Sequence, residues 1–127
     1  MSVPLRSLAV AAVAIAALVA APATLARDDD VHVRGACTQG SSVELELSDE
    51  DGRIEVELEV DQNRNGVPWR VTLRRNGVVV ATRAARTRAP SGSFEVRRIV
   101  ANGPGRDRIS ATATRSGETC VARATWR

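Results

Sequence analysis

Three glutamates alternate along one short stretch of the chain, at Glu55, Glu57 and Glu59. On one face of a β-strand consecutive side chains lie about 7 Å apart, and glycosidases hold their two carboxylates at separations of that order. A glycosidase also needs a cleft that raises the pKa of one carboxyl group. Nothing around these glutamates predicts such a cleft, so we interpret them as the solvated face of a strand.

The chain has a single histidine, His32, and two cysteines. Nucleophilic catalysis of the familiar kinds needs a base next to a serine or cysteine nucleophile. His32 falls in a segment, residues 27–36, that we expect to be flexible, and no second histidine supports it. The sequence therefore predicts no enzyme, no catalytic residue and no cofactor.

The segment from Asp61 to Gly66 reads Asp-Gln-Asn-Arg-Asn-Gly and matches the first half of a calcium-binding loop. Asp61, Asn63 and Asn65 would be the ligands. Position twelve of such a loop would be Thr72 in place of the bidentate glutamate, and Arg64 lies beside the carboxylate of Asp61. We keep calcium as an alternative and favour an ordinary turn between two strands.

The two cysteines, Cys37 and Cys120, can pair in only one way. A bond between them closes about 83 residues of chain, which the loop-entropy model values at roughly 4 to 5 kcal/mol. Disulfides persist in oxidising compartments, so this pairing predicts an exported protein.

The first 26 residues have the pattern of a cleaved signal peptide. An apolar run covers residues 7–21 and small residues follow it, with Ala26 as the favoured cleavage position and Ala23 as the second. The run is shorter than the roughly 20 residues that a membrane-spanning helix needs. The alternative is a retained membrane anchor or a buried core helix. We expect a secreted protein whose mature chain has no transmembrane helix.

After Gly35 the sequence alternates with period two, and turn residues interrupt it every eight to twelve positions. Asp51-Gly52 and Asn76-Gly77 are strong hairpin signals. The pattern predicts one all-β domain over residues 37–127, an antiparallel β-sandwich of about seven strands. The expected strands are 43–47, 53–60, 67–75, 78–83, 93–99, 107–114 and 119–126.

Alternation also predicts a core that is thin, because many of its members are alanine or valine. Trp69, Phe94 and Trp126 must supply much of its volume. The expected core residues are Leu45, Ile54, Val56, Leu58, Val60, Trp69, Val71, Leu73, Val79, Phe94, Val96, Ile109, Ala111, Ala113, Ala122, Ala124 and Trp126.

The last two expected strands, with the turn Ser116-Gly-Glu118 between them, resemble the final hairpin of bacterial immunoglobulin-like and fibronectin-III-like domains. Trp69 matches the buried tryptophan of such domains. The whole chain is similar to small secreted actinobacterial proteins of uncharacterised role, which implies export and adhesion or binding. In this kind of sandwich the first strand is parallel to the last, so we expect the disulfide to join the beginnings of two parallel neighbours. The resemblance departs from antibody domains, because the bond does not join their usual strands and the chain has no tyrosine.

Charge divides the chain into two parts. Residues 27–61 hold 12 acids and 3 arginines, whereas residues 62–127 hold 3 acids and 14 arginines. We expect an acidic outer face on one sheet and a basic edge on the other. The simplest interpretation is that both are ordinary solvated faces, partly neutralised by cross-strand pairs such as Glu57 with Arg97, and the alternative is a binding surface. The basic edge would comprise Arg70, Arg74, Arg75 and Arg83, with Arg86 and Arg88 in the loop beyond.

These features predict a non-enzymatic extracellular binding or adhesion module. Arginine suits phosphate and carboxylate groups, so the partner would be an anionic cell-surface polymer or an acidic protein surface. For such a module we expect a monomer or weak self-association. The first alternative is a structural cell-envelope protein that self-associates. The second is a secreted hydrolase inhibitor. Nucleic acid is not expected, because few aromatic residues are interleaved with the arginines.

Overall fold

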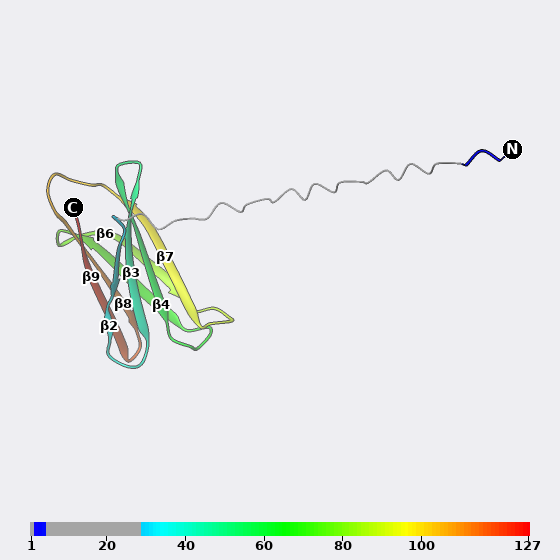
Figure 1. Ribbon diagram of the computed structural model, residues 1–127. Helices are drawn as coiled ribbons and strands as arrows, with labels where there is room; N and C mark the ends of the chain where they lie inside the picture. The colour runs from blue at the N-terminus through cyan, green and yellow to red at the C-terminus, as the bar shows by residue number, and fades with distance from the viewer. Residues whose placement is uncertain (1, 5–28) are drawn as a thin grey trace.

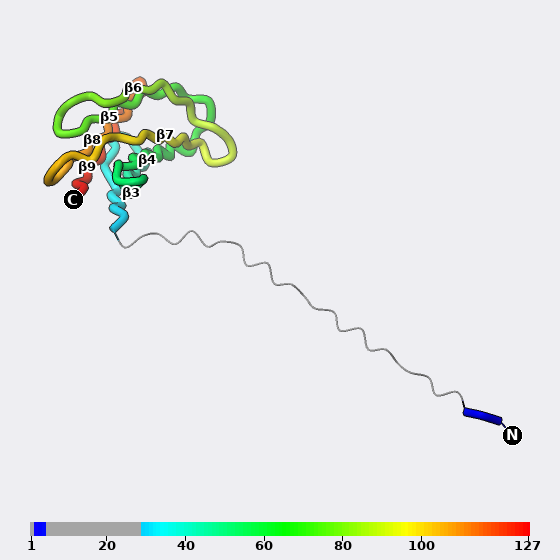
Figure 2. Tube along the Cα trace, turned by 90° about the horizontal axis from the view of Figure 1, so that it is seen from above, coloured from blue at the N-terminus to red at the C-terminus, as the bar shows by residue number. Residues whose placement is uncertain are grey.

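The computed structural model describes residues 2–4 and 29–127, and nearly all of the expected signal peptide lies outside them. The described chain folds into two layers of antiparallel strands (Figure 1), and the layers are seen edge-on in Figure 2. Residues 2–4 and 29–127 contain no helix that is long and apolar enough to cross a membrane. The predicted fold class, a single antiparallel β-sandwich, is confirmed.

Nine strands of the described residues build the two sheets, two more than the seven expected. The first sheet has the order β1-β3-β4-β7 and the second the order β2-β9-β8-β5-β6. The strands of the first sheet are β1 (Val31–Arg34), β3 (Ser42–Glu50), β4 (Arg53–Asp61) and β7 (Ser93–Val100). The strands of the second are β2 (Ala36–Cys37), β5 (Pro68–Arg75), β6 (Val78–Arg86), β8 (Asp107–Arg115) and β9 (Glu118–Trp126).

Both predicted hairpin turns are present. Asp51 and Gly52 connect β3 to β4, and Asn76 and Gly77 connect β5 to β6. All four residues have positive φ, between 49° and 82°. A two-residue turn of this hand matches the natural twist of the strands, which is why an Asx residue followed by glycine occupies it.

Of the two additional strands, β1 lies within the segment 27–36 that we expected to be flexible, and β2 begins at the last residue of that segment. Val31–Arg34 pairs with β3, because Val31 and Val33 pack on the core while His32 and Arg34 face outward. The chain then crosses to the other sheet at Gly35. A Cβ atom there would lie 2.2 Å from the backbone oxygen of Val121, so the crossing needs glycine.

The core agrees with the alternation except at one position. Every expected core residue but Val79 is buried, together with Val43, Leu47 and Val100. Val79 is 51% exposed. A register shift between Leu73 and Arg74 places Ala81 opposite Leu73 and Val79 opposite Arg74, so the bulge turns Val79 to the outer face.

The disulfide between Cys37 and Cys120 is present, but its setting differs from the expectation. The two cysteines lie directly opposite each other on β2 and β9, which are antiparallel, with their Cα atoms 4.0 Å apart. They join a short edge strand to its neighbour within one sheet. The extra strand β2, too short to be read from periodicity, is the reason for the correction.

Candidate functional site

A groove lies along the open side of the sandwich, between β6 and β7. Each of these strands is the last in its sheet, and the two contact each other across the gap between the layers (Figure 2). The groove has a volume of about 420 Å³. Four arginines and one glutamate line it around an apolar floor. Its lining residues are Arg83, Ala84, Ala85, Arg86, Arg88, Phe94, Glu95, Val96 and Arg97.

The groove brings together three of the arginines predicted from the sequence. Arg83 lies opposite the buried Val71, so its Cα–Cβ direction is inward, and its position on an edge strand lets the guanidinium reach solvent. Arg86 ends the same strand and donates a hydrogen bond to the carbonyl oxygen of Gly66 at 2.8 Å. Arg88 follows after one residue. All three side chains are exposed.

The residue between Arg86 and Arg88 holds this end of the groove in place. Thr87 is 1% exposed, and its hydroxyl oxygen accepts a hydrogen bond from the Val67 amide at 2.9 Å. The Thr87 amide in turn donates to the Val67 carbonyl at 3.0 Å. Arg88 continues the pairing, since its amide donates to the Ser93 carbonyl at 3.0 Å. The two arginines therefore project from fixed backbone.

Arg75 does not belong to this surface. Its guanidinium pairs with Asp107, with Nη2 at 2.9 Å and Nε at 3.0 Å from Oδ1. Asp107 is 1% exposed and also accepts hydrogen bonds from the Asn76 side chain and the Gly103 amide. The pair is structural, because Arg75 neutralises a buried carboxylate beside the β5–β6 turn.

Arg70 and Arg74 lie on the outer face of the five-stranded sheet. Arg74 lies opposite Ser110, and Ser110 lies opposite Arg123 on the next strand. Five arginines that alternate with buried neighbours share this face, which we call the arginine face. They are Arg70, Arg74, Arg86, Arg108 and Arg123. The strands of this sheet place no carboxylate on it, because their two acids, Asp107 and Glu118, are buried.

The opposite outer face of the sandwich is acidic, as the alternation predicted. The strands of the four-stranded sheet direct eight carboxylates outward, and we call this the acidic face. They are Glu44, Glu46, Glu50, Glu55, Glu57, Glu59, Asp61 and Glu95. Three arginines lie among them, at positions 34, 53 and 97.

Several of these glutamates face one another directly. Glu46 lies opposite Glu57, and Glu59 has Glu44 on one side and Glu95 on the other. Like charges directly opposite each other destabilise a sheet. Burial, followed by the hydrogen bond and the negative charge of Glu57, raises the pKa of Glu95 above its usual range.

Arg97 relieves part of this repulsion, and the predicted pairing with Glu57 is confirmed. The two residues are opposite each other in the register, and Arg97 Nη2 lies 2.9 Å from Glu57 Oε2. The same guanidinium is 3.3 Å from Glu55 and 3.4 Å from Glu95. The Glu57 hydrogen bond and the Glu55 charge raise the pKa of Arg97 further above its usual range.

A shallow hollow of about 310 Å³ over β1, β3 and β4 includes Glu44, Glu46, Glu57 and Glu59 in its lining. Two carboxylates near a hollow are a requirement of a glycosidase, but one of them must also be withdrawn from water. The side chains of Glu44, Glu46 and Glu57 are 57%, 38% and 24% exposed, and Glu59 is exposed as well, so none of the four is buried. The hollow therefore lacks the desolvated carboxyl group that would act as an acid.

The candidate calcium loop is built as a turn. Asp61 Oδ1 accepts a hydrogen bond from the Asn63 amide at 2.9 Å, and Asn63 has a positive φ of 56°. The Gln62 amide donates to the Gly92 carbonyl, and Trp69 Nε1 donates to the Gln62 side chain at 3.0 Å. Asn65 is exposed. Among the described residues, the groups of acids, histidine and cysteines close enough to share a metal ion do not include Asp61.

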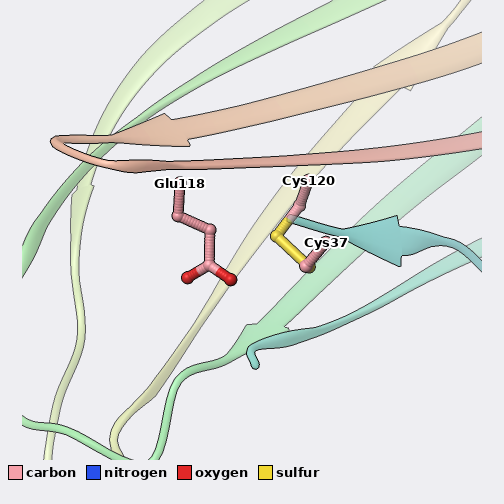
Figure 3. A group of neighbouring side chains, drawn as sticks. All are labelled: Cys37, Glu118 and Cys120. Carbon is pink, nitrogen blue, oxygen red and sulfur yellow. A yellow bond between two sulfur atoms is a disulfide. The ribbon is translucent and has the colours of Figure 1, made fainter. Parts of the chain in front are cut away.

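A buried carboxylate that the sequence analysis overlooked lies beside the disulfide. Glu118 is 3% exposed and projects from β9 on the same side as Cys120 (Figure 3). Its Oε2 accepts the amides of Gln39, Gly40 and Ser41 at 2.9 to 3.2 Å. Its Oε1 accepts the Ser41 hydroxyl at 2.6 Å and Arg115 Nε at 3.1 Å.

These contacts decide the ionisation of Glu118. Burial alone would raise its pKa, but the hydrogen bonds from Ser41, Gln39 and Arg115 outweigh burial and lower the pKa below its usual range. The ligand atoms of Cys37, Glu118 and Cys120 lie within 4.8 Å of one another. Both sulfur atoms are bonded to each other, so they offer no thiolate to a metal.

Comparison with known proteins adds no assignment, since no protein-family model, curated protein or solved structure matches this chain.

Proposed function

We propose that the protein is an exported, non-enzymatic binding module whose groove between β6 and β7 binds an anionic polymer of the cell envelope. The observation that carries the proposal is the convergence of Arg83, Arg86 and Arg88 on one concave surface. Export is supported by the signal-peptide pattern of residues 1–26 and by the disulfide.

The charges of the groove suit an anion. Arg83 and Arg88 form no ion pair with a carboxylate of the described chain, and Arg86 uses one nitrogen on a backbone carbonyl. Guanidinium groups bind phosphate and carboxylate oxygens in a fork geometry. The single carboxylate of the lining, Glu95, lies 3.4 Å from Arg97. The groove is therefore electropositive along the β6 side.

The shape of the groove favours a chain over a flat surface. Ala85, Phe94 and Val96 form an apolar floor, which can cover the carbon backbone of a polymer while its anionic groups meet the arginines. The edge strand β6 also leaves backbone donors unpaired along the same side. A globular acidic protein would contact the rim and leave the floor empty.

Binding of poly(glycerol phosphate) to the purified, oxidised protein tests the proposal, with polyglutamate and dextran as comparison polymers. The test variant is Arg83→Gln with Arg88→Gln. The matched control is Arg64→Gln with Arg106→Gln, which removes the same charge from two exposed loop positions that do not line the groove.

We expect the groove variant to weaken poly(glycerol phosphate) binding at least about tenfold, since each lost charge contact is worth on the order of 1 kcal/mol. We expect the control to change it less than about twofold. Equal losses in both variants would mean that net charge alone attracts the polymer. Tighter binding of polyglutamate would point to an acidic protein as the partner.

A further inference from the structure

The two outer faces of the sandwich carry opposite charge and lie back to back. The arginine face holds five positive charges and no carboxylate from its strands. The acidic face holds eight carboxylates and three arginines, a net charge of −5. The two charges are equal and opposite, so the part of the molecule that carries them is a strong dipole.

Each face keeps an excess of one charge after the ion pairs within the molecule are formed. Three pairs of glutamates face each other across β3, β4 and β7, and the ion pairs of Arg34 and Arg97 neutralise only part of the acidic charge. On the arginine face, the arginines lie opposite small residues such as Ala84, Thr114 and Ser110. Because these neighbouring side chains are short, the long arginine side chains stay accessible to a surface that approaches from outside.

We propose that the acidic face of one copy docks on the arginine face of a second copy, so that molecules associate front to back. The contact would pair the glutamates of β3, β4 and β7, whose charge is only partly neutralised within the molecule, with the arginines of β5, β6, β8 and β9. Arg86, Glu95 and Arg97 also line the groove between β6 and β7, so the test below uses other residues of the two faces.

The geometry of the faces determines the kind of association. Two twisted sheets pack face to face at an angle of about 30° in aligned β-sandwiches, so twisted outer faces are compatible with stacking. Four strands of about eight residues cover roughly 500 Å² per copy, which is at the lower limit for a specific interface.

The contact joins two different surfaces, and such heterologous contacts build open assemblies unless the rotation closes a ring. We expect weak, reversible growth that depends on protein concentration.

Two variants that each disable one face make the test specific. Glu46→Arg with Glu59→Arg reverses two charges on the acidic face, and Arg70→Glu with Arg123→Glu does the same on the arginine face. Neither variant changes a residue of the groove. Arg64→Glu with Arg106→Glu is the control for net charge. Circular dichroism and thermal unfolding verify that each variant folds, and Glu→Gln and Arg→Gln versions replace any that does not.

Light scattering across a concentration series, at low and at about 1 M salt, measures the result. At low salt we expect the native protein and the loop control to grow in mass with concentration. Each face variant should remain a monomer by itself. An equimolar mixture of the two should form dimers and stop, because each partner contributes one intact face. High salt shortens the Debye length to about 3 Å and should dissociate all of them.

Three results would overturn the proposal. The first is a native protein that stays monomeric at low salt up to millimolar concentration. The second is association that survives in both face variants, and the third is a mixture of the two variants that does not associate. Polymer binding by the face variants, measured separately, reports on the groove and leaves this conclusion unaffected.

Discussion

The guanidinium of Arg75 lies 2.9 Å from Oδ1 of Asp107, a carboxylate that is 1% exposed at the start of β8. Arg74, its neighbour in the chain, faces solvent on the outer side of the same sheet. Two adjacent arginines therefore have different roles. One compensates a buried charge, and the other contributes to a charged surface.

We expect Arg75→Ala to destabilise the fold by about 2 to 4 kcal/mol, because it leaves the Asp107 charge buried without its cation. Arg74→Ala removes the same side chain one position away and should cost less than about 0.5 kcal/mol. Urea unfolding of both variants measures the difference. Because Arg75 does not line the groove, polymer binding by folded Arg75→Ala should equal that of the native protein. Equal stability of the two variants would contradict the structural role.

Glu118→Gln should destabilise the protein by roughly 2 kcal/mol or more. Both carboxylate oxygens accept hydrogen bonds, so an amide nitrogen in place of either one would face donors. Removing one partner of a buried charged network costs about 1.5 to 3 kcal/mol. Glu59→Gln, on the exposed acidic face, is the control and should change the midpoint of urea unfolding little. A Glu118 variant as stable as this control would mean that the loop of Gln39 to Ser41 folds without its anchor.

The pH dependence of stability follows from the same residue. The pKa of Glu118 is lower in the folded protein than its ordinary value of 4.5. The stabilisation from a depressed carboxyl pKa is complete above the unfolded pKa and disappears as the pH falls through the folded pKa. The stability difference between the native protein and Glu118→Gln should therefore be constant near neutral pH and shrink below about pH 4.5. Urea titrations at several acidic pH values test this. A stability difference that grows as the pH falls would contradict a lowered pKa of Glu118 in the folded protein.

Local signals predicted most of the fold. Asp51-Gly52 and Asn76-Gly77 placed two hairpins, because few residue pairs tolerate the positive φ that such turns need. Strict alternation in residues 53–60 identified which side of that strand is buried. Both kinds of signal act over a few residues, so they can be read without knowing the neighbouring strands.

Features that depend on the pairing of distant strands were missed. The bulge that turns Val79 outward is a property of the β5–β6 register, and the sequence has no local mark of it. Likewise, Arg75 could not be told from Arg74 until β8 placed Asp107 beside it. Val31–Arg34 does alternate, and a stricter use of the pattern would have found that strand.

The arginines of the candidate site were predicted from the sequence only where they lie close together in the chain. Arg83, Arg86 and Arg88 are close in the chain, and one edge strand and its following loop bring them together. Arg108 and Arg123 belong to the same surface as Arg70 and Arg74 but come from β8 and β9. Their alternation with Ile109 and Ala124 was a usable signal, since it placed both arginines on the outer side of the final hairpin.

We expect removal of the disulfide to destabilise the protein more than the substitutions of Arg75 or Glu118. The bond between Cys37 and Cys120 spans 83 positions of sequence and holds β2, which pairs with β9 at only two positions. We expect Cys37→Ala with Cys120→Ala to cost roughly 4 kcal/mol in the chain-entropy model, which corresponds to about 15 to 30 °C in Tm for a domain of this size.

Alanine is the suitable replacement, because Cys120 is fully buried and a serine hydroxyl there would add the cost of an unpaired polar group. Thermal unfolding of this variant, of the oxidised protein and of the native protein in reductant measures the effect. The reduced protein and the alanine variant should have closely similar Tm values if the disulfide stabilises the protein mainly by restricting the unfolded chain. A loss below about 1 kcal/mol in both would show that the two sheets hold together without the bond.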